Sequence, residues 1–218
     1  MRVRARFDEK LQEMENMLIK MGAEVEEIVS LAFKSFIDQD HGLAEIVIKM
    51  DETIDYLEIE VEKKCIALIA LQQPLAGDLR EIAGILKIIT DLERIGDYAV
   101  NIAKITLEFD DEEEFIKPII DLPKMEHHVQ QMVKGSLDAF VNKDVDLARE
   151  IAQLDDAVDD LYEEIYTELL ELGVKDKQTK QQVIRLLFVG RHLERMADHV
   201  TNICERVIYM IEGIRENY

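Results

Sequence analysis

Leu92-Glu93-Arg94-Ile95-Gly96-Asp97 is matched 101 positions later by Leu193-Glu194-Arg195-Met196-Ala197-Asp198. Towards the N-terminus the match continues at a spacing of 104, from residues 18–57 onto residues 122–161. The change in spacing indicates that a loop in the second copy is shorter by three residues. Because two unrelated acidic segments do not keep register over this length, the chain is predicted to be a duplication of one unit.

Each unit is predicted to contain three helices, because its apolar residues recur at helical spacing. In the first copy the apolar residues form three such stripes, which cover residues 7–36, 47–61 and 85–102. A polar break at residues 38–42 and Pro74 separate them, since proline disfavours a helical residue before it. In the second copy we expect helices near residues 125–142, 144–172 and 177–214.

The predicted fold is therefore all-α, with two tandem antiparallel three-helix bundles that contain six helices. The first repeat is expected over residues 1–108, a linker over 109–121 and the second repeat over 122–218. An acidic run at 110–114 and a proline at position 118 mark the linker. The stripes are long enough for the bundles to share their packing, so one elongated domain and two separable domains both fit the pattern.

Composition limits the partners and the compartment. The net charge of −21 argues against nucleic acid, which needs clustered Lys and Arg, and favours metal cations or basic protein surfaces. Cys65 and Cys204 stand alone in helical patterns and are expected to be reduced core thiols. We find no apolar leader and no apolar run near the ~20 residues that a membrane span needs. We expect a cytoplasmic protein that reaches a membrane only through partners.

Four pairs of acids are the candidate functional residues. Each pair is spaced four apart, which places both carboxylates on one helix face. In a chain with 47 acids among 218 residues, one such pair indicates little more than a solvated face. These pairs, however, recur at matched positions in both copies: Asp51 and Asp55, Glu93 and Asp97, Asp155 and Asp159, Glu194 and Asp198.

The hairpin register brings the pairs together. If the second and third helices of the first copy fold back at Pro74, Asp51 faces Asp97, and Asp55 faces Glu93. In the second copy the corresponding fold point lies between residues 176 and 177. A helical wheel places both quartets outside the apolar stripe. Each copy is thus predicted to carry four carboxylates at one level on the outside of its bundle.

Clustered carboxylates repel one another, and a multivalent cation removes this repulsion. Oxygen ligands suit hard ions such as Mg²⁺, Ca²⁺, Mn²⁺ or ferric iron rather than zinc in a thiolate cage. Asn101 and Asn202, one turn further along, are possible additional ligands. Arg94 and Arg195 offer the alternative of neutralising the acids without a metal.

Other readings of the acids remain open. No histidine follows a glutamate by three residues, which argues against a ferritin-like di-iron site, although His192 and His199 flank the second quartet. Phosphate-loop, nucleophile-elbow and metalloprotease motifs are missing, so we predict that the chain is not an enzyme. A metal-dependent phosphohydrolase, a metal-storage protein and a metal-free scaffold are the alternatives.

At these motifs the sequence resembles the PhoU family. The resemblance rests on Asp91-Leu92-Glu93-Arg94-Ile95-Gly96-Asp97, on its counterpart at 193–198, on Gln73-Pro74-Leu75-Ala76-Gly77-Asp78-Leu79-Arg80, and on Asp51-Glu52-Thr53-Ile54-Asp55. It covers essentially the whole chain, although the second turn lacks the Gln-Pro of the first. It implies two bundles side by side, with multinuclear metal clusters of iron, or of manganese, magnesium or zinc, on the eight matched acids.

The resemblance also implies a role. Such a protein is an accessory protein of phosphate-specific transport and a negative regulator of phosphate uptake and of the phosphate-starvation response. It is expected to be an adaptor between the ATPase subunit of the phosphate ABC transporter and a sensor histidine kinase. A homodimer is a further expectation from the family.

Overall fold

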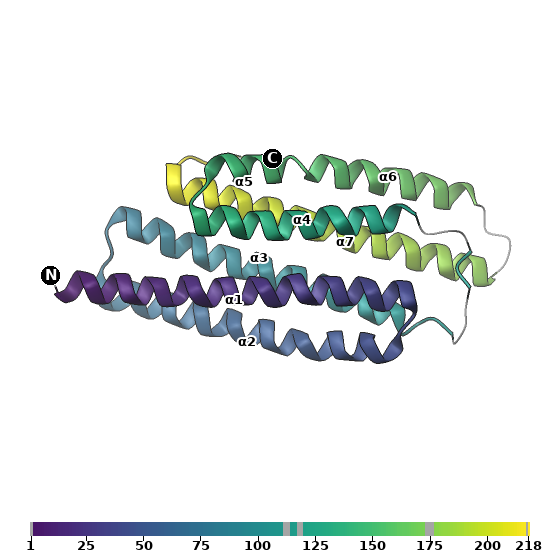
Figure 1. The fold of residues 1–218 in the computed structure, drawn as a ribbon, viewed down its shortest axis with the longest axis horizontal. Helices are drawn as coiled ribbons and strands as arrows, with labels where there is room; N and C mark the ends of the chain where they lie inside the picture. The colour runs from purple at the N-terminus through teal and green to yellow at the C-terminus, as the bar shows by residue number, and fades with distance from the viewer. Residues whose placement is uncertain (1, 111–113, 117–119, 173–176, 217) are drawn as a thin grey trace.

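The computed structural model describes residues 2–110, 114–116, 120–172, 177–216 and 218. In these residues the secondary structure consists of helices, with turns and loops between them and no strands (Figure 1). This confirms the predicted all-α fold. Two bundles follow one another along the chain, as the duplication predicts. The helices are α1 (Arg2–Asp38), α2 (His41–Gln72), α3 (Ala76–Thr106), α4 (Asp121–Asn142), α5 (Val145–Ala152), α6 (Asp155–Glu171) and α7 (Lys177–Glu212).

The turns between helices are specified locally. Asp40 caps α2, because its side chain accepts a hydrogen bond of 2.9 Å from the backbone N–H of Leu43. In the second copy Asp144 caps α5 in the same way, at 3.0 Å from the N–H of Leu147. At the next turn α2 ends at Gln72, and Gln73 adopts a left-handed φ of 46° before Pro74. The hairpin predicted at this proline is therefore present.

The second copy differs from the prediction in one helix. One helix was expected over residues 144–172, and the structure interrupts it at Gln153 and Leu154, between α5 and α6. The Leu154 N–H bonds to the carbonyl of Ile151 three residues back, at 3.1 Å, so the helix tightens there. As a result, α6 begins at Asp155, the first acid of the second quartet.

Parts of the predicted connections lie outside the described residues. These are the acids at 111–113 and the proline at 118 in the linker, and the second fold point at 176–177, of which only Lys177 is described. The other helix bounds are close to those predicted.

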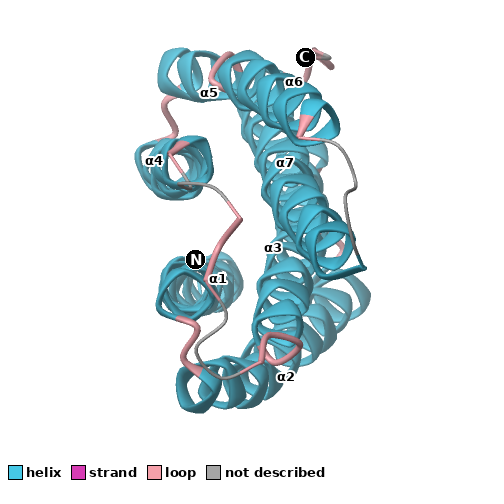
Figure 2. Ribbon diagram, turned by 90° about the vertical axis from the view of Figure 1, so that its right-hand side faces the viewer, coloured by secondary structure: helices cyan, strands magenta, loops and turns pink. Residues whose placement is uncertain are grey.

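The two bundles pack side by side along α3 and α7, which run antiparallel at the centre, while α1 and α4 lie next to each other (Figures 1 and 2). Buried apolar residues of both copies form one continuous cluster. The copies are related by an approximate two-fold rotation. At the α1–α4 contact, the Gln130 side chain donates to the carbonyl of Glu26 at 3.3 Å, and these two residues are equivalent positions of the repeat.

Small residues and thiols complete the interior. A Cβ added to Gly84 of α3 would lie 2.1 Å from the sulfur of Met210 in α7, so the glycine permits the close approach of these helices. Cys65 and Cys204 are buried and free, as predicted, and burial raises the pKa of each thiol to about 12. Among the described residues, no helix is long and apolar enough to cross a membrane.

Candidate functional site

The first quartet is assembled by the hairpin of α2 and α3. Asp51 of α2 is half-buried, and burial followed by the charges of Asp55 and Asp97 raises its pKa to about 6. Since electrostatic coupling of this kind needs short distances, the structure brings together acids that lie more than 40 positions apart in the sequence. The sequence-based pairing across Pro74 agrees with this arrangement.

Glu93 is the second half-buried acid of this quartet. Burial, followed mainly by the charge of Asp97, raises its pKa to about 7, although Arg94 acts in the opposite direction. Arg94 Nη1 pairs with Asp97 Oδ2 at 2.9 Å, and Arg94 Nε lies 3.4 Å from Glu93 Oε2. Arg94 thus neutralises part of the quartet, which was the alternative considered from the sequence.

The second quartet repeats this arrangement on α6 and α7. Burial raises the pKa of Asp155 to about 7, with Asp159, Asp198 and Glu194 adding to the effect. The pKa values of Asp159 and Glu194 are also raised, first by burial and then by Asp198. Arg195 pairs with Asp198 at 2.9 Å, matching Arg94 and Asp97 in the first copy.

Four buried carboxylate oxygens in the quartets have no hydrogen-bond partner among the described residues. They are Asp51 Oδ1, Glu93 Oε2, Asp155 Oδ1 and Glu194 Oε2, two from each copy and at matched positions. Glu93 Oε2 and Glu194 Oε2 lie 3.4 and 3.8 Å from the Nε atoms of Arg94 and Arg195, at ion-pair distance. A buried acceptor without a hydrogen bond is costly, and this cost recurs at matched positions in both copies. The donor set, carboxylate oxygen alone, suits hard cations. The donor chemistry therefore suits the metal that the sequence predicts, and the metal site stays a prediction.

The quartets lie outside the apolar core, as the helical wheel predicts: Asp55 and Asp159 are exposed. The structure adds that Asp51, Glu93, Asp155 and Glu194 are half-buried between two helices. Gly96 contributes to this in the first copy, because a Cβ there would lie 3.0 Å from Asp51 Oδ1. As the side chains stand, no three His, Cys, Asp or Glu among the described residues form a group that could hold an ion.

Asn101 and Asn202, the possible additional ligands, differ in their contacts with the other repeat. Asn101 is half-buried one turn beyond Asp97. Asn202 is also half-buried, and its amide nitrogen lies 3.5 Å from Asp91 Oδ1 of α3. Asn202 is thus turned towards the other repeat.

His192 and His199, which flank the second quartet, lie at the contact between the repeats. His199 Nδ1 lies 2.9 Å from Asp91 Oδ1, across the α3–α7 contact. The rings of His192 and Tyr98 are in tilted contact with their centres 5.7 Å apart, and burial lowers the pKa of His192. Asp91 and Tyr98 are the repeat equivalents of His192 and His199, as the spacing of 101 between the repeats specifies.

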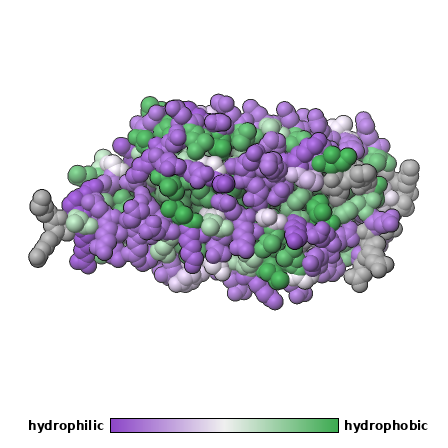
Figure 3. Space-filling model, in the orientation of Figure 1, coloured by the Kyte–Doolittle hydropathy of each residue, from purple (hydrophilic) through white to green (hydrophobic). Residues whose placement is uncertain are grey.

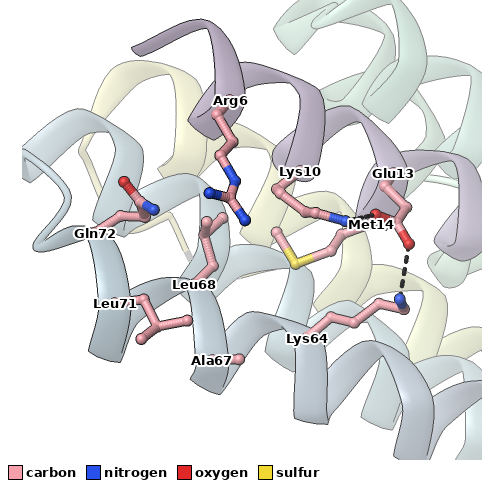
Figure 4. Close-up of a pocket in the computed structure, with 9 residues that line it drawn as sticks. All are labelled: Arg6, Lys10, Glu13, Met14, Lys64, Ala67, Leu68, Leu71 and Gln72. Carbon is pink, nitrogen blue, oxygen red and sulfur yellow. Dashed lines mark hydrogen bonds and ion pairs between the residues drawn. The ribbon is translucent and has the colours of Figure 1, made fainter. Parts of the chain in front are cut away.

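Two hollows are relevant to the choice of site. A groove beside the second quartet is lined by Asp159, Glu194, Arg191, Tyr162 and neighbouring residues of α6. A more apolar groove of ≈ 220 Å³ lies far from both quartets, between the start of α1 and the end of α2 (Figure 4). Its single carboxylate, Glu13, is held by Lys10 and Lys64. Hydrophilic side chains cover most of the face seen in Figure 3. The quartets remain the candidate site.

Comparison with known proteins supports the sequence-based resemblance. Residues 18–106 and 122–207 each match the family model described as the PhoU domain. The chain is 42% identical over 210 residues to the "Phosphate-specific transport system accessory protein PhoU homolog" of Clostridium acetobutylicum, covering 95% of this chain and 94% of that protein. It is 34% identical to the "Phosphate-specific transport system accessory protein PhoU" of Escherichia coli, covering 97% and 87%.

Solved structures agree. The phosphate transport system regulatory protein PhoU from Streptococcus pneumoniae superposes with a TM-score of 0.90 at 32% identity, covering 97% of this chain and 100% of that one. PhoU from Pseudomonas aeruginosa gives a TM-score of 0.91 at 36% identity, covering 95% and 100%.

Proposed function

Since the chain belongs to the PhoU family, we propose that it is an accessory and regulatory protein of phosphate-specific transport. Within this role we propose a negative regulator of phosphate uptake and of the phosphate-starvation response. It acts in the cytoplasm as an adaptor between the ATPase subunit of the phosphate ABC transporter and a sensor histidine kinase. The similar proteins are named as accessory or regulatory proteins, which is consistent with a role other than catalysis.

The observation that carries the metal part of this proposal is that matched buried oxygens in both quartets accept no hydrogen bond from the described residues. Each quartet binds iron, or manganese, magnesium or zinc in its place, through Asp51, Asp55, Glu93 and Asp97 or their repeat equivalents. Four carboxylates can bridge more than one ion, so the sites are multinuclear. To bind, the carboxylates turn inwards, and Arg94 and Arg195 release Asp97 and Asp198.

The metal gives the adaptor a defined surface. Without it, the carboxylates stand half-buried and close to one another, and burial, followed by the neighbouring negative charges, raises the pKa values of Asp51, Glu93 and Asp155. A bound cation would fix the relative position of the two helices of each hairpin and reduce the local negative charge. Both effects favour a surface on which a partner protein docks, and a homodimer is a further part of the proposal.

Deleting the gene tests the regulatory role. We expect phosphate-starvation genes to be expressed at high phosphate in the deletion strain and repressed again by the wild-type gene. Unchanged expression after deletion would contradict the role. Complementation with a chain carrying Glu93→Gln and Glu194→Gln then tests whether the quartets are needed, with His127→Ala as an exposed control.

Elemental analysis tests the metal itself. Protein purified without chelators, and protein loaded with iron, manganese or zinc, should retain metal that is lost when both quartets carry Asn or Gln. Metal-free wild-type protein after loading would remove the quartets as sites. A loaded protein that turns over phosphate esters, with Asp97→Asn abolishing turnover, would favour the phosphohydrolase alternative.

A further inference from the structure

The linker between the repeats fills a site at one end of the molecule. Phe115 packs against Phe36 of α1 and against Phe109, three residues after α3, with ring centres 5.5 Å apart in both contacts. Beside it, the Gln182 side chain of α7 accepts a hydrogen bond from the N–H of the residue after Phe115 and donates one to the carbonyl of the residue before it, both 2.8 Å long. The site therefore holds a short non-helical segment by one ring and two main-chain hydrogen bonds.

The equivalent site of the other repeat is an open groove of ≈ 310 Å³, between the start of α3 and the ends of α4 and α7. These helix ends lie opposite the linker end of the molecule in Figure 1. Three residues that line the groove are the repeat equivalents of Phe36, Phe109 and Gln182, namely Phe140, Met210 and Glu81. The walls that enclose Phe115 in one repeat thus enclose a hollow in the other.

The residues that follow α7 correspond to the linker, yet they leave the groove uncovered. They turn to α5, where Arg149 donates to both carboxylate oxygens of Glu216, at 2.7 and 3.1 Å. The main-chain N–H of Tyr218 donates to Glu205 at 3.1 Å, and Figure 1 shows the chain end beside α5. None of the described residues after Glu212 lines the groove. The groove is therefore open to a segment of another molecule.

Glu81 and Lys143 together offer a main chain what Gln182 offers the linker. Lys143 Nζ donates to Glu81 Oε1 at 2.5 Å, and both residues line the groove. A carboxylate accepts hydrogen bonds from main-chain N–H groups as the amide oxygen does. The Lys143 side chain is exposed, and an ammonium has three protons, so it can also donate to a main-chain carbonyl. The pair replaces the acceptor and the donor of the amide.

The charge of the groove is opposite to that of the filled site. In the filled site Arg185 lies over the ring of Phe109, at 4.6 Å from its centre, and the linker segment beside it is acidic. The repeat equivalent of Arg185 is Gly84, so this base is missing at the groove. Glu81 replaces the neutral Gln182. Charge complementarity therefore favours an occupant with a basic residue where the linker has acids.

Other charged residues at the groove do not reverse this preference. Asp78, at the position of Thr179, lines the groove and pairs with Arg4 at 2.6 Å, so its charge is matched. Glu15 of α1 is half-buried, and burial, followed by the charge of Glu81, raises its pKa. It adds a further carboxylate to this region. Arg80 lies next to Gly213 and is not among the residues that line the groove.

We propose that this groove binds a partner protein through a short non-helical segment that inserts a phenylalanine-sized side chain between Phe140 and Met210 and carries Lys or Arg beside it. Its main chain bonds to Glu81 and Lys143, as the linker bonds to Gln182. The groove shares no residue with either quartet, so this inference goes beyond the proposed function and needs no metal.

Synthetic peptides test the groove on the full chain, by fluorescence anisotropy. The probe Lys-Lys-Lys-Phe-Ile-Lys-Pro copies residues 112–118 with lysine in place of the three acids. We expect it to bind, and its version with Ala in place of Phe should bind about tenfold more weakly or worse, since a ring is no longer buried. Both peptides carry the same charge, so this difference excludes non-specific attraction to an acidic chain. The natural sequence Glu-Glu-Glu-Phe-Ile-Lys-Pro should bind more weakly than the probe.

Two variants of the chain place the binding site. Gly77 lines the groove, and an added Cβ there has no neighbour within 4 Å, so Gly77→Phe puts a ring at the groove without a clash at Cβ. It should weaken binding of the probe by about tenfold or more. Glu81→Gln restores the amide of the filled site and should reduce the preference for the basic peptide while keeping the preference for Phe over Ala. His127→Phe adds a ring at an exposed position outside the groove and should change nothing. Circular dichroism checks that each variant is folded.

The outcomes distinguish the possible occupants. Equal affinities for the Phe and Ala peptides, or unchanged binding by folded Gly77→Phe, would overturn the groove as the site. Self-association of the wild-type chain in sedimentation that Gly77→Phe removes would make a second copy the occupant and overturn the partner segment. Probe binding only by a chain that ends at Glu212 would assign the groove to the chain's own last residues, with the same consequence. These failures would leave the proposed role in phosphate regulation intact, because the deletion strain tests that role separately.

Discussion

Asp91 Oδ1 of α3 and His199 Nδ1 of α7 lie 2.9 Å apart, and this contact joins the two repeats at their central helices. Both side chains are half-buried, which limits competition from water. Around the approximate two-fold axis, the equivalent positions hold Tyr98 and His192, whose rings are in tilted contact. The Tyr98 ring also lies 5.8 Å from the His199 ring, so polar and aromatic contacts meet at this seam.

Removing His199 should weaken the association of the repeats. His199→Ala leaves a half-buried Asp91 with only the longer contact from Asn202, so we expect the free energy of unfolding to fall by about 1–3 kcal/mol. Urea unfolding followed by circular dichroism measures this. His127 is exposed, and His127→Ala should change stability by less than about 0.5 kcal/mol. Equal effects of the two substitutions would show that the seam contact contributes nothing.

The metal-free protein should lose stability as the pH rises from about 4 to 7. The pKa values of Asp51, Glu93 and Asp155 are raised to about 6, 7 and 7, so the folded chain binds more protons than the unfolded chain in this window. His192, whose pKa burial lowers, acts in the opposite direction in this window, but it is one group against three, so the slope of stability against pH is negative. The lowered pKa of Glu13, about 2, acts below its ordinary value of 4.5 and so outside this window.

Glu93→Gln isolates this effect. The variant should be more stable than the wild type at pH 7.5 by roughly 1 kcal/mol, after allowance for solvent screening of a half-exposed charge, and the difference should vanish near pH 4.5. Thermal and urea unfolding in the presence of a chelator provide the measurement. A difference that is the same at both pH values would mean that the substitution acts through packing instead.

Bound metal should offset the repulsion between the carboxylates of each quartet and so raise the melting temperature. Mn²⁺ at a hundred times its dissociation constant adds about 2.7 kcal/mol per site, which corresponds to roughly 5–10 °C for a chain of this size. Excess chelator should return the transition to its original temperature. Substituting Asn or Gln for Asp51, Glu93, Asp155 and Glu194 should abolish the shift; a shift that survives in this variant would place the metal elsewhere.

The close approach of α3 to α7 at Gly84 can be tested by substituting this glycine. Gly84→Val would bring side-chain atoms into Met210 and should destabilise the protein by about 1–3 kcal/mol. Gly77, in the same helix, has no neighbouring atom within 4 Å of an added Cβ, so Gly77→Ala should be neutral or stabilise by roughly 0.5–1 kcal/mol. The pair of denaturation curves compares a crowded and an open position, and a stable Gly84→Val protein would argue against tight packing here.

The quartets could be predicted because their register is local. Two helices joined by a short turn at Pro74 have one antiparallel alignment, so residue numbers alone place Asp51 opposite Asp97, and the second copy repeats the alignment. The helices themselves followed from apolar spacing, and the caps from Asp40 and Asp144. The helix break before Asp155 contains no proline or glycine, so the residue types there did not predict a break.

By itself, the sequence determined the duplication, the helices and the acids that meet within each hairpin, because these depend on short-range geometry that residue spacing encodes. Only the tertiary structure decided that His199 reaches Asp91, that Arg191 pairs with Glu194, and that one oxygen of Glu93 is buried without a hydrogen bond among the described residues. These contacts depend on how two bundles pack and on which way long side chains turn. Helical periodicity specifies which face of a helix is buried, but it does not specify the partner helix or the rotamer.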